Sequence, residues 1–227
     1  MTNMDNLIQL HLHTSESSAC SRCPAAEMAF ACKAAGYSLI VITDHFLNAN
    51  TTASTRAPWP KQVETLMRGY KHAKFVGDRI GLHVLFGWET FNDGPEYLTY
   101  GLGEEFLLSN PDIALLNAKD YLLRVEAAGG FVCHAHPYRS ADYIPPFKPM
   151  HSHLEAFEVY NANNRPEYNP PALADARRHG MIEMAGADAH SPLQVCAGAM
   201  RTPFPVHDDA SLIAALRTRQ CEIIESF

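Results

Sequence analysis

Short apolar segments with strand propensity alternate along this chain with segments of helical periodicity, and this alternation restricts the fold more than any other feature. The run at residues 38–43 (SLIVIT) is almost entirely apolar or β-branched, which is typical of a strand buried on both faces. A helical pattern at residues 24–35 precedes it and ends at Gly36. Further strand-like and helical segments follow, about seven strands in all. We therefore predict an α/β fold with parallel strands that close into a barrel, as a single domain over residues 1–227.

Composition excludes several classes of protein. The 18 Lys and Arg residues are outnumbered by 25 Asp and Glu, giving a net charge of −7, so we expect no broad nucleic-acid-binding surface. No apolar run approaches the roughly 18 residues of a membrane span, and the first residues lack a secretory signal pattern. We therefore expect no membrane association and a cytoplasmic location. The six cysteines do not suggest a disulfide framework. A redox role for the C-x-x-C pair Cys20 and Cys23 remains an alternative to free thiols.

The first strand-like segment carries two histidines one residue apart, in IQLHLHT. Side chains alternate between the faces of an extended strand. His11 and His13 are therefore expected on one face, and Ile8, Leu10 and Leu12 on the other. The apolar face explains why the segment forms a strand, but it does not explain two imidazoles that point to the same place.

Polar groups of the same kind recur where later strand-like segments begin or end. In a parallel α/β barrel the carboxyl ends of the strands form the active-site face. Buried imidazoles and carboxylates that converge there are stabilised by coordinating cations, so the pattern predicts a site for more than one metal ion. The groups concerned are Asp44, His45, Glu89, Glu96, His134, His136, Asn161, Asp188 and His190.

The remaining histidines do not follow this pattern. Because His134 and His136 would share a face of their strand, both could reach a metal ion. We prefer His136, beside Pro137, as the ligand and expect His134 to support it. Histidines in helical segments, in a loop, or at the wrong end of a strand are predicted to lie outside the site: His72, His83, His151, His153, His179 and His207.

Five short motifs, HLHT, ITDH, GWE, AHP and GADAH, occur in this order and cover the chain from His11 to about Ser191. Together they resemble the polymerase-and-histidinol-phosphatase (PHP) family of metal-dependent phosphoesterases. The resemblance implies a distorted (β/α)7 barrel that binds two or three divalent ions, Mn, Zn or Fe, at its C-terminal face.

The resemblance also implies ligand sets, motif by motif. Glu89 would bridge the first ion to a second ion that His136 also binds, and His45 and His190 match ligands of a third. The ligands of the first ion would be His11, His13, Glu89 and Asp188.

The chain departs from the family pattern at two points. Members with a third ion have an Asp or His after the first motif, where this chain has Ser18 and Ala19, so Glu16 and Cys20 are the alternatives. Many members carry a ligand histidine near the segment PEYLTYG, where Glu96 is the nearest candidate here. An oxygen ligand at that position would favour harder ions such as Mn²⁺ or Fe²⁺.

The activity expected from the resemblance is hydrolysis of a phosphate ester, a monoester or a diester, by a hydroxide that bridges the ions. Asp188 would orient or deprotonate the attacking water, and His190 or His45 would protonate the leaving oxygen. The expected substrate is a small phosphorylated metabolite or a nucleotide. Arg139 and Asn161 are expected to bind it, Arg22 and Arg201 are further candidates, and Asp44 is expected to support the ligands.

Two other functions remain open at this point. An amidohydrolase-like barrel that hydrolyses C–N bonds also begins with H-x-H on its first strand, but it often uses a carboxylated lysine as the bridging ligand. None of the strand-like segments carries a lysine near its end, and Glu89 takes the bridging place. The third possibility is a non-catalytic, metal-binding regulatory module, in which every coordination position would be closed.

Overall fold

The computed structural model describes residues 6–92, 94–145 and 149–226. Within these residues, nine strands form one sheet in the order β7-β6-β5-β4-β3-β2-β1-β8-β9. The strands are β1 (Leu7–Gln9), β2 (Leu39–Ile42), β3 (His83–Phe91), β4 (Glu96–Tyr100), β5 (Phe131–Ala135), β6 (Ala156–Asn161), β7 (Ile182–Gly186), β8 (Ala197–Arg201) and β9 (Glu222–Ser226).

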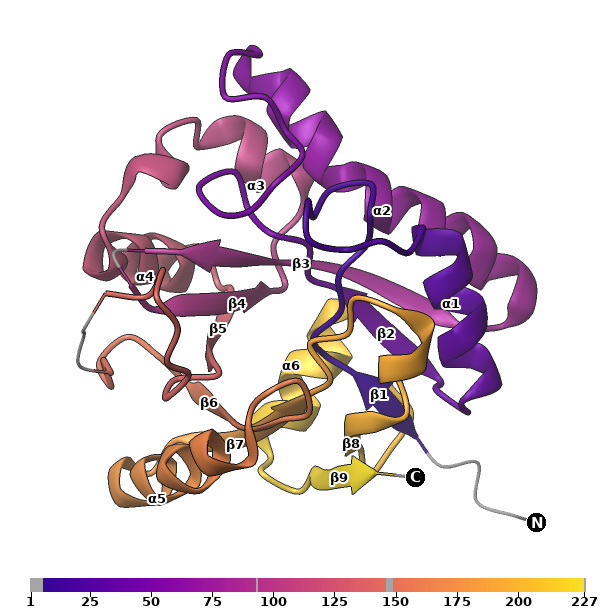
Figure 1. The fold of residues 1–227 in the computed structure, drawn as a ribbon, viewed down its shortest axis with the longest axis vertical. Helices are drawn as coiled ribbons and strands as arrows, with labels where there is room; N and C mark the ends of the chain where they lie inside the picture. Colours follow the sequence, from indigo (N-terminus) through magenta and orange to yellow (C-terminus); the bar gives the residue numbers. More distant parts are fainter. Residues whose placement is uncertain (1–5, 93, 146–148, 227) are drawn as a thin grey trace.

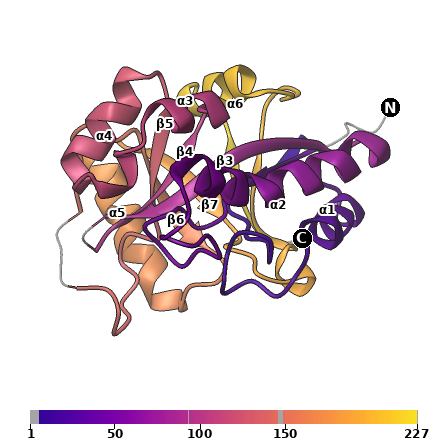
Figure 2. The same cartoon turned by 90° about the horizontal axis from the view of Figure 1, so that it is seen from above.

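Helices cover the outside of this curved sheet (Figures 1 and 2). The two N-terminal helices α1 and α2 pack together beside β2 and β3, α4 packs on β5, and α5 packs on β6 and β7. The helices are α1 (Ala25–Ala34), α2 (Trp59–Ile80), α3 (Glu104–Ser109), α4 (Ala118–Ala127), α5 (Asn169–His179) and α6 (Asp209–Arg217), with short 3-10 turns η1 (Ile113–Leu115), η2 (Pro166–Tyr168) and η3 (Pro192–Gln194).

The sheet is mixed, which corrects the prediction of parallel strands throughout. Strands β1, β2 and β3 are parallel, as are β5, β6 and β7, but β4 is antiparallel to both of its neighbours. The link from Phe91 to Glu96 is too short for the helical crossover that a parallel connection needs. Strand β8 is antiparallel to β1, and β9 is antiparallel to β8. The α/β class holds, but the fold is a nearly closed, mixed barrel.

The barrel closes where the segment after β1 meets the segment after β7. Leu12 and Ala189 form a parallel bridge, and the His13 backbone N–H donates to the Ala189 carbonyl at 2.9 Å. The Ala187 N–H donates to the Gln9 side-chain oxygen at 2.9 Å. This closure, called the seam below, brings the first motif of the chain beside the last.

The alternation expected for the first strand breaks within it. The Gln9 side-chain oxygen accepts from the backbone N–H groups of Leu10 and His11 at 3.0 and 3.1 Å, which ends the regular strand at Gln9. Leu10 stays with Ile8 in the core inside the sheet, and Leu12 joins the core beneath α1. His11 also turns inward, where it contacts a carboxylate of β6. The prediction that His11 lies opposite Ile8 and Leu10 was therefore wrong.

Apolar side chains fill the inside of the sheet at the end opposite to the histidines. Helix α6 contributes Leu212 and Leu216 to this core, together with Ile8 of β1 and Leu39 of β2. Packing of one end by α6 leaves the other end of the barrel for polar groups. None of the helices in the described residues combines the length and the apolar character that a membrane span requires.

Candidate metal centre

Four buried side chains converge beside the seam: His11, His13, Glu89 and Asp188. The Nε2 atoms of His11 and His13 are 3.1 Å apart. Glu89 oxygens lie 3.3 and 3.4 Å from these nitrogens, and Asp188 Oδ1 lies 3.5 and 3.3 Å from them. Four ligands bound tetrahedrally to Zn²⁺ at about 2.0–2.1 Å would be about 3.4 Å apart. The spacing and chemistry of these donors fit a divalent cation.

Glu89 is the hub of a wider cluster. Besides His11 and His13, its carboxylate lies 2.9 Å from His136 Nε2 and 3.1 Å from His45 Nδ1. Glu96 Oε2 is 3.6 Å from His136 Nδ1. Glu96 begins β4, but because β4 runs antiparallel, this residue lies at the same end of the barrel as the ends of β3 and β5. A carboxylate among four imidazoles is placed to bridge two cations.

A third group of possible ligands consists of His13, His45 and His190. The rings of His45 and His190 lie 4.5 and 4.4 Å from the ring of His13. Of the two alternatives for the missing family ligand, the structure brings Cys20 here, with its Sγ 3.2 Å from His190 Nε2. The Glu16 carboxylate instead accepts a hydrogen bond from the backbone N–H of Ala25, the first residue of α1.

The sequence analysis missed Glu158, which organises the cluster from behind. It is buried on β6 and accepts from His11 Nδ1, from the His136 backbone N–H and from Asn161 Nδ2, each at 2.9 Å. A Cβ at Gly186 would lie 2.2 Å from Glu158 Oε1 and 2.5 Å from His11 Cβ, so only glycine leaves room for this contact. The signal that could have identified Glu158 in the sequence is a carboxylate within an otherwise apolar strand-like segment.

Asp44, expected to support the ligands, lies on the opposite side of the cluster. It accepts from the Thr14 N–H at 2.5 Å and from the Ser18 hydroxyl at 2.7 Å, and Ser18 Oγ lies 3.1 Å from His13 Nδ1. Helix α2 passes close to the Asp44 carboxylate at Gly69. A Cβ at this position would lie 2.3 Å from Asp44 Oδ2. The chain Asp44–Ser18–His13 fixes the orientation of the imidazole.

His134 and His136 do not share a face, in contrast to the expectation. His136 follows β5 with a positive φ of 30°, which turns its ring toward Glu89. The buried His134 ring packs against Tyr97 and Phe157, in the core outside the sheet. The structure therefore does not bring His134 to the ligands that it was expected to support.

Arg139 lies at the rim of the cluster and holds Asp188. Its Nη2 is 2.6 Å from Asp188 Oδ2 and 3.2 Å from Asn161 Oδ1, and its Nε donates to Asn164 Oδ1 at 2.8 Å. Asn164 was not predicted. The Arg139 side chain is 18% exposed, so it can reach both the cluster and solvent.

The two further arginine candidates differ in position. Arg22 is exposed on the loop that carries Cys20. Arg201 is paired with Leu7 at the start of β1 and with Glu222, at the end of the barrel away from the cluster. The prediction of a substrate contact by Arg201 was wrong because the sequence does not show that β8 runs antiparallel.

The charges of the cluster depend on one another. Burial alone would raise the pKa of Glu89 and of Asp188. The neighbouring cationic groups, His11 foremost, together outweigh burial and hold both pKa values well below their usual range. Burial would lower the pKa of His11, yet Glu158 and Asp188 raise it well above its ordinary value. The pKa of His13 falls to about 3 because of burial and the nearby His45. Without metal, ionised carboxylates keep a proton on His11, and a divalent cation would compete for that position.

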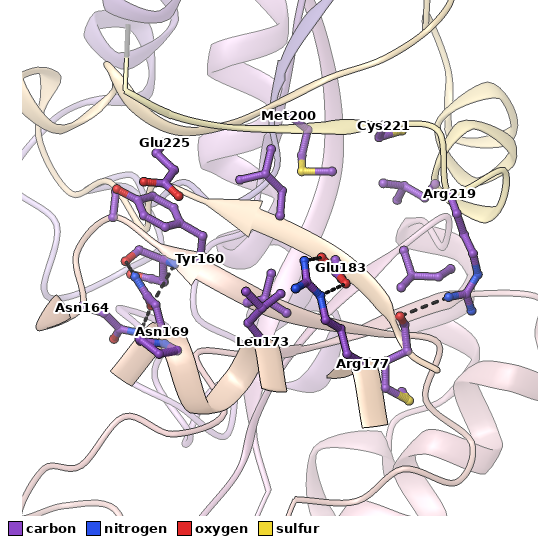
Figure 3. A pocket seen from close by; sticks show the side chains of 18 of the residues that line it. Tyr160, Asn164, Asn169, Leu173, Arg177, Glu183, Met200, Arg219, Cys221 and Glu225 are labelled. Carbon is purple, nitrogen blue, oxygen red and sulfur yellow. Dashed lines mark hydrogen bonds and ion pairs between the residues drawn. The ribbon is translucent and has the colours of Figure 1, made fainter. Parts of the chain in front are cut away.

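A cavity of about 1000 Å³ lies beside this cluster, between α5, β7 and β9 (Figure 3). Its lining includes Asn161 and Asn164, which also contact Arg139, and it extends to Arg219 and Cys221. Among its described lining residues there is no imidazole. The cavity therefore adjoins the metal-binding groups through the two asparagines without containing those groups.

The histidines expected to lie outside the site do so. The rings of His83 and His207 contact each other at the start of β3, and His153 pairs with Glu126. His151 and His179, however, are not isolated, because both contact Asp175.

Comparison with known proteins addresses the fold. A family model described as PHP-associated matches residues 166–221. A two-domain protein from Bacteroides vulgatus, named as containing a predicted PHP-like metal-dependent phosphoesterase, superposes with a TM-score of 0.73 at 13% identity. The superposition covers 99% of this chain and 66% of that protein. The fold is PHP-like.

Two other solved structures share this PHP-like fold with the chain. An amidohydrolase from Chromobacterium violaceum, with bound sulfate and no metal, superposes with a TM-score of 0.60 at 14% identity over 96% of this chain and 97% of its own. The lesion-specific endonuclease PfuEndoQ from Pyrococcus furiosus gives the same TM-score and identity over 96% of this chain and 57% of its own. No protein with a curated description matches the chain in sequence. The resemblance to the PHP family predicted from the motifs is thus confirmed in the fold.

Proposed function

We propose that this chain is a metal-dependent hydrolase that acts on the phosphate ester of a small metabolite or nucleotide. The observation that carries the proposal is the convergence of four imidazoles on the Glu89 carboxylate, beside Asp188 and Arg139. Mixed imidazole and carboxylate donors suit Mn, Zn or Fe ions. The motif order and the PHP-like fold support the same assignment.

The donors divide into groups that share members. His11, His13, Glu89 and Asp188 would hold the first ion, and Glu89 would bridge it to a second ion that His136 also binds. Glu96 lies within ligand distance of His45 and Glu89. His45, His190 and Cys20 are the candidate ligands of a third ion. Because a thiolate is softer than the Asp or His of the family, this third position would favour Zn²⁺ over Mn²⁺.

When bound, such ions lower the pKa of a shared water and neutralise charge on the phosphoryl oxygens. The protein groups supply orientation and proton transfer. Asp188, held by Arg139 at 2.6 Å, would orient the attacking water beside the ion that its Oδ1, which faces His11 and His13, helps to hold. His190 accepts or donates at Nε2 near the rim, where a leaving oxygen would depart.

Arg139 is the residue best placed to bind the phosphate. Its Nε and Nη2 contact Asn164, Asn161 and Asp188, so Nη1 is the nitrogen that would donate to a phosphoryl oxygen. Because the guanidinium is planar, the contacts of Nε and Nη2 also fix the direction of Nη1, which a flexible ammonium cannot match. This contact favours a phosphate ester over an uncharged amide.

Hydrolysis of a C–N bond is the second candidate, because one structural neighbour is named an amidohydrolase. Among the described residues no lysine lies on a strand, and Glu89 stands at the bridging position. A metal-loaded protein that cleaves amides but no phosphoester would favour this second candidate.

The test combines elemental analysis with a substrate panel. Chelated protein is reloaded with Mn²⁺, Zn²⁺ or Fe²⁺ and assayed on aryl phosphomonoesters and phosphodiesters, nucleotides, short oligonucleotides and cyclic amides. Asp188→Asn should lose metal together with at least about 100-fold in kcat/KM, since it removes a charged ligand and the group that orients the water. The exposed Asp78, paired with Lys74 on α2, provides the matched control Asp78→Asn, which should change neither. Absence of phosphoester hydrolysis by any metal-loaded form would refute the proposal.

A further inference from the structure

A second group of metal-binding side chains lies apart from the candidate centre, on helix α5. Asp175 and His179 are one helical turn apart, so they share a face of the helix, and His151 comes from the segment before β6. Asp175 Oδ2 is 2.9 Å from His151 Nε2, and Asp175 Oδ1 is 3.0 Å from His179 Nδ1. One ligand atom from each residue lies within 4.8 Å of the other two. We propose that these three side chains bind a divalent transition-metal ion such as Zn²⁺.

The donor set and its surroundings suit a cation. The two imidazole rings stack with centroids 3.7 Å apart, a spacing that is unfavourable if both are protonated but acceptable for neutral ligands. Two imidazoles and one carboxylate form a common zinc ligand set. Asp175 is 9% exposed, whereas His151 and His179 are 29% and 36% exposed, so solvent can supply the remaining ligand.

The position on the helix contributes as well. Helix α5 ends at His179, and the carbonyl end of a helix attracts positive charge. Arg177, in the same turn, would oppose a cation, but its guanidinium is paired with Glu183 at 2.9 Å. Arg178 of the same turn adds a positive charge, so Asp175 and the carbonyl end of the helix are the groups that favour a bound ion.

The loop ligand is held in place before any ion binds. The His151 ring stacks on Phe157 at 5.4 Å as well as on His179, so its orientation is fixed between two rings. Tyr138 also interacts with Asp175. Because Tyr138 and Arg139 are neighbours in the segment between β5 and β6, an ion at this cluster would fasten to α5 the segment that carries the rim arginine.

The alternative is a clamp without metal, in which His151 donates to Asp175 Oδ2, and His179 Nδ1 lies 3.0 Å from Asp175 Oδ1 and 3.1 Å from the Asp175 backbone carbonyl. Gln and Asn reproduce these hydrogen bonds but coordinate zinc poorly. In His151→Gln the amide replaces Nε2, and in His179→Asn it replaces Nδ1, the two atoms that face Asp175. The double variant therefore keeps the clamp and removes the metal ligands.

Zinc is counted per chain by mass spectrometry after chelation, reloading and desalting. The wild-type chain should hold one equivalent more than the double variant. The control His153→Gln changes a histidine two residues from His151. His153 pairs with Glu126 instead of Asp175, so this variant should match the wild type. In a Co²⁺ titration, the double variant should show weaker visible absorption than the wild type, because it lacks the same site.

Equal zinc counts in the wild type and the double variant would overturn the proposal and leave only the hydrogen-bonded clamp. Thermal unfolding in excess chelator checks that the double variant folds as the wild type does. The result does not depend on the function proposed above. If the Glu89 centre bound no metal, that function would fail, but the difference of one equivalent would remain.

Discussion

Glu158→Gln should weaken metal binding at His11 although Glu158 is not itself a proposed ligand. Glu158 Oε1 accepts from His11 Nδ1, and Oε2 accepts from the His136 N–H and from Asn161 Nδ2, each at 2.9 Å. A glutamine has a single oxygen, so one of these two positions must present an N–H donor. The orientation that keeps two of the three hydrogen bonds points the amide N–H₂ at His11 Nδ1.

The His11 imidazole can accept that donor only by moving its own proton to Nε2. Nε2 is the nitrogen that lies 3.1 Å from His13 Nε2 and would bind the first ion. Loss of the outer partner of a metal-binding imidazole typically lowers metal affinity about 10–100-fold, which corresponds to about 1.4–2.7 kcal/mol. Loss of a buried hydrogen bond to a charged group should also lower the metal-free unfolding free energy by about 1.5–3 kcal/mol.

Competition with a chelating dye measures the affinity, and urea unfolding of the metal-free protein measures the stability. Glu183→Gln is the matched control, because Glu183 lies on the neighbouring strand β7 but pairs with Arg177 near the surface. An exposed pair of this kind contributes at most about 1 kcal/mol. An affinity of folded Glu158→Gln within twofold of the wild type would refute the proposed control of the His11 tautomer.

Three further predictions concern other parts of the cluster. In metal-free protein, hydrogen bonds with two histidines outweigh burial and lower the Cys20 pKa to about 6, so alkylation of Cys20 should increase with pH through a midpoint near 6. Peptide mapping separates Cys20 from the exposed Cys196. A midpoint near the ordinary thiol value of about 8.5 would contradict this prediction. Gly69→Ala should lower the unfolding free energy measured in urea by about 1–3 kcal/mol, because the alanine Cβ would lie 2.3 Å from Asp44 Oδ2. Alanine is the better helix former, so unchanged or higher stability would count against this close approach. Arg139→Lys keeps the charge but loses the planar fork, so KM for a phosphoester should rise about tenfold or more, and an unchanged KM would remove Arg139 from phosphate binding.

Local pattern was enough to predict which residues could carry chemistry, because metal ligands follow strands whose apolar runs are easily recognised. It also placed them together, since the ends of neighbouring strands meet at one edge of a sheet. His11, His45, Glu89, His136 and Asp188 all lie in the observed cluster.

Some of the mispredicted features have local causes that a simple alternation pattern does not express, and one depends on partners distant in sequence. The direction of β4 follows from a short link, and the inward turn of His11 follows from a Gln9 side chain that replaces a strand partner. The positive φ at His136 separates it from His134 in a way that strict alternation cannot express. Glu158 was overlooked because its importance comes from three donors on three different segments.

The seam has a consequence for how this protein matures. Leu12 and Ala189 lie far apart in sequence, yet their pairing is what sets His11 beside Asp188. A nascent chain that has not yet reached residue 189 therefore lacks one wall of the site and cannot capture a cation in the intended geometry. Loading with metal would follow the non-local joining of these two edges.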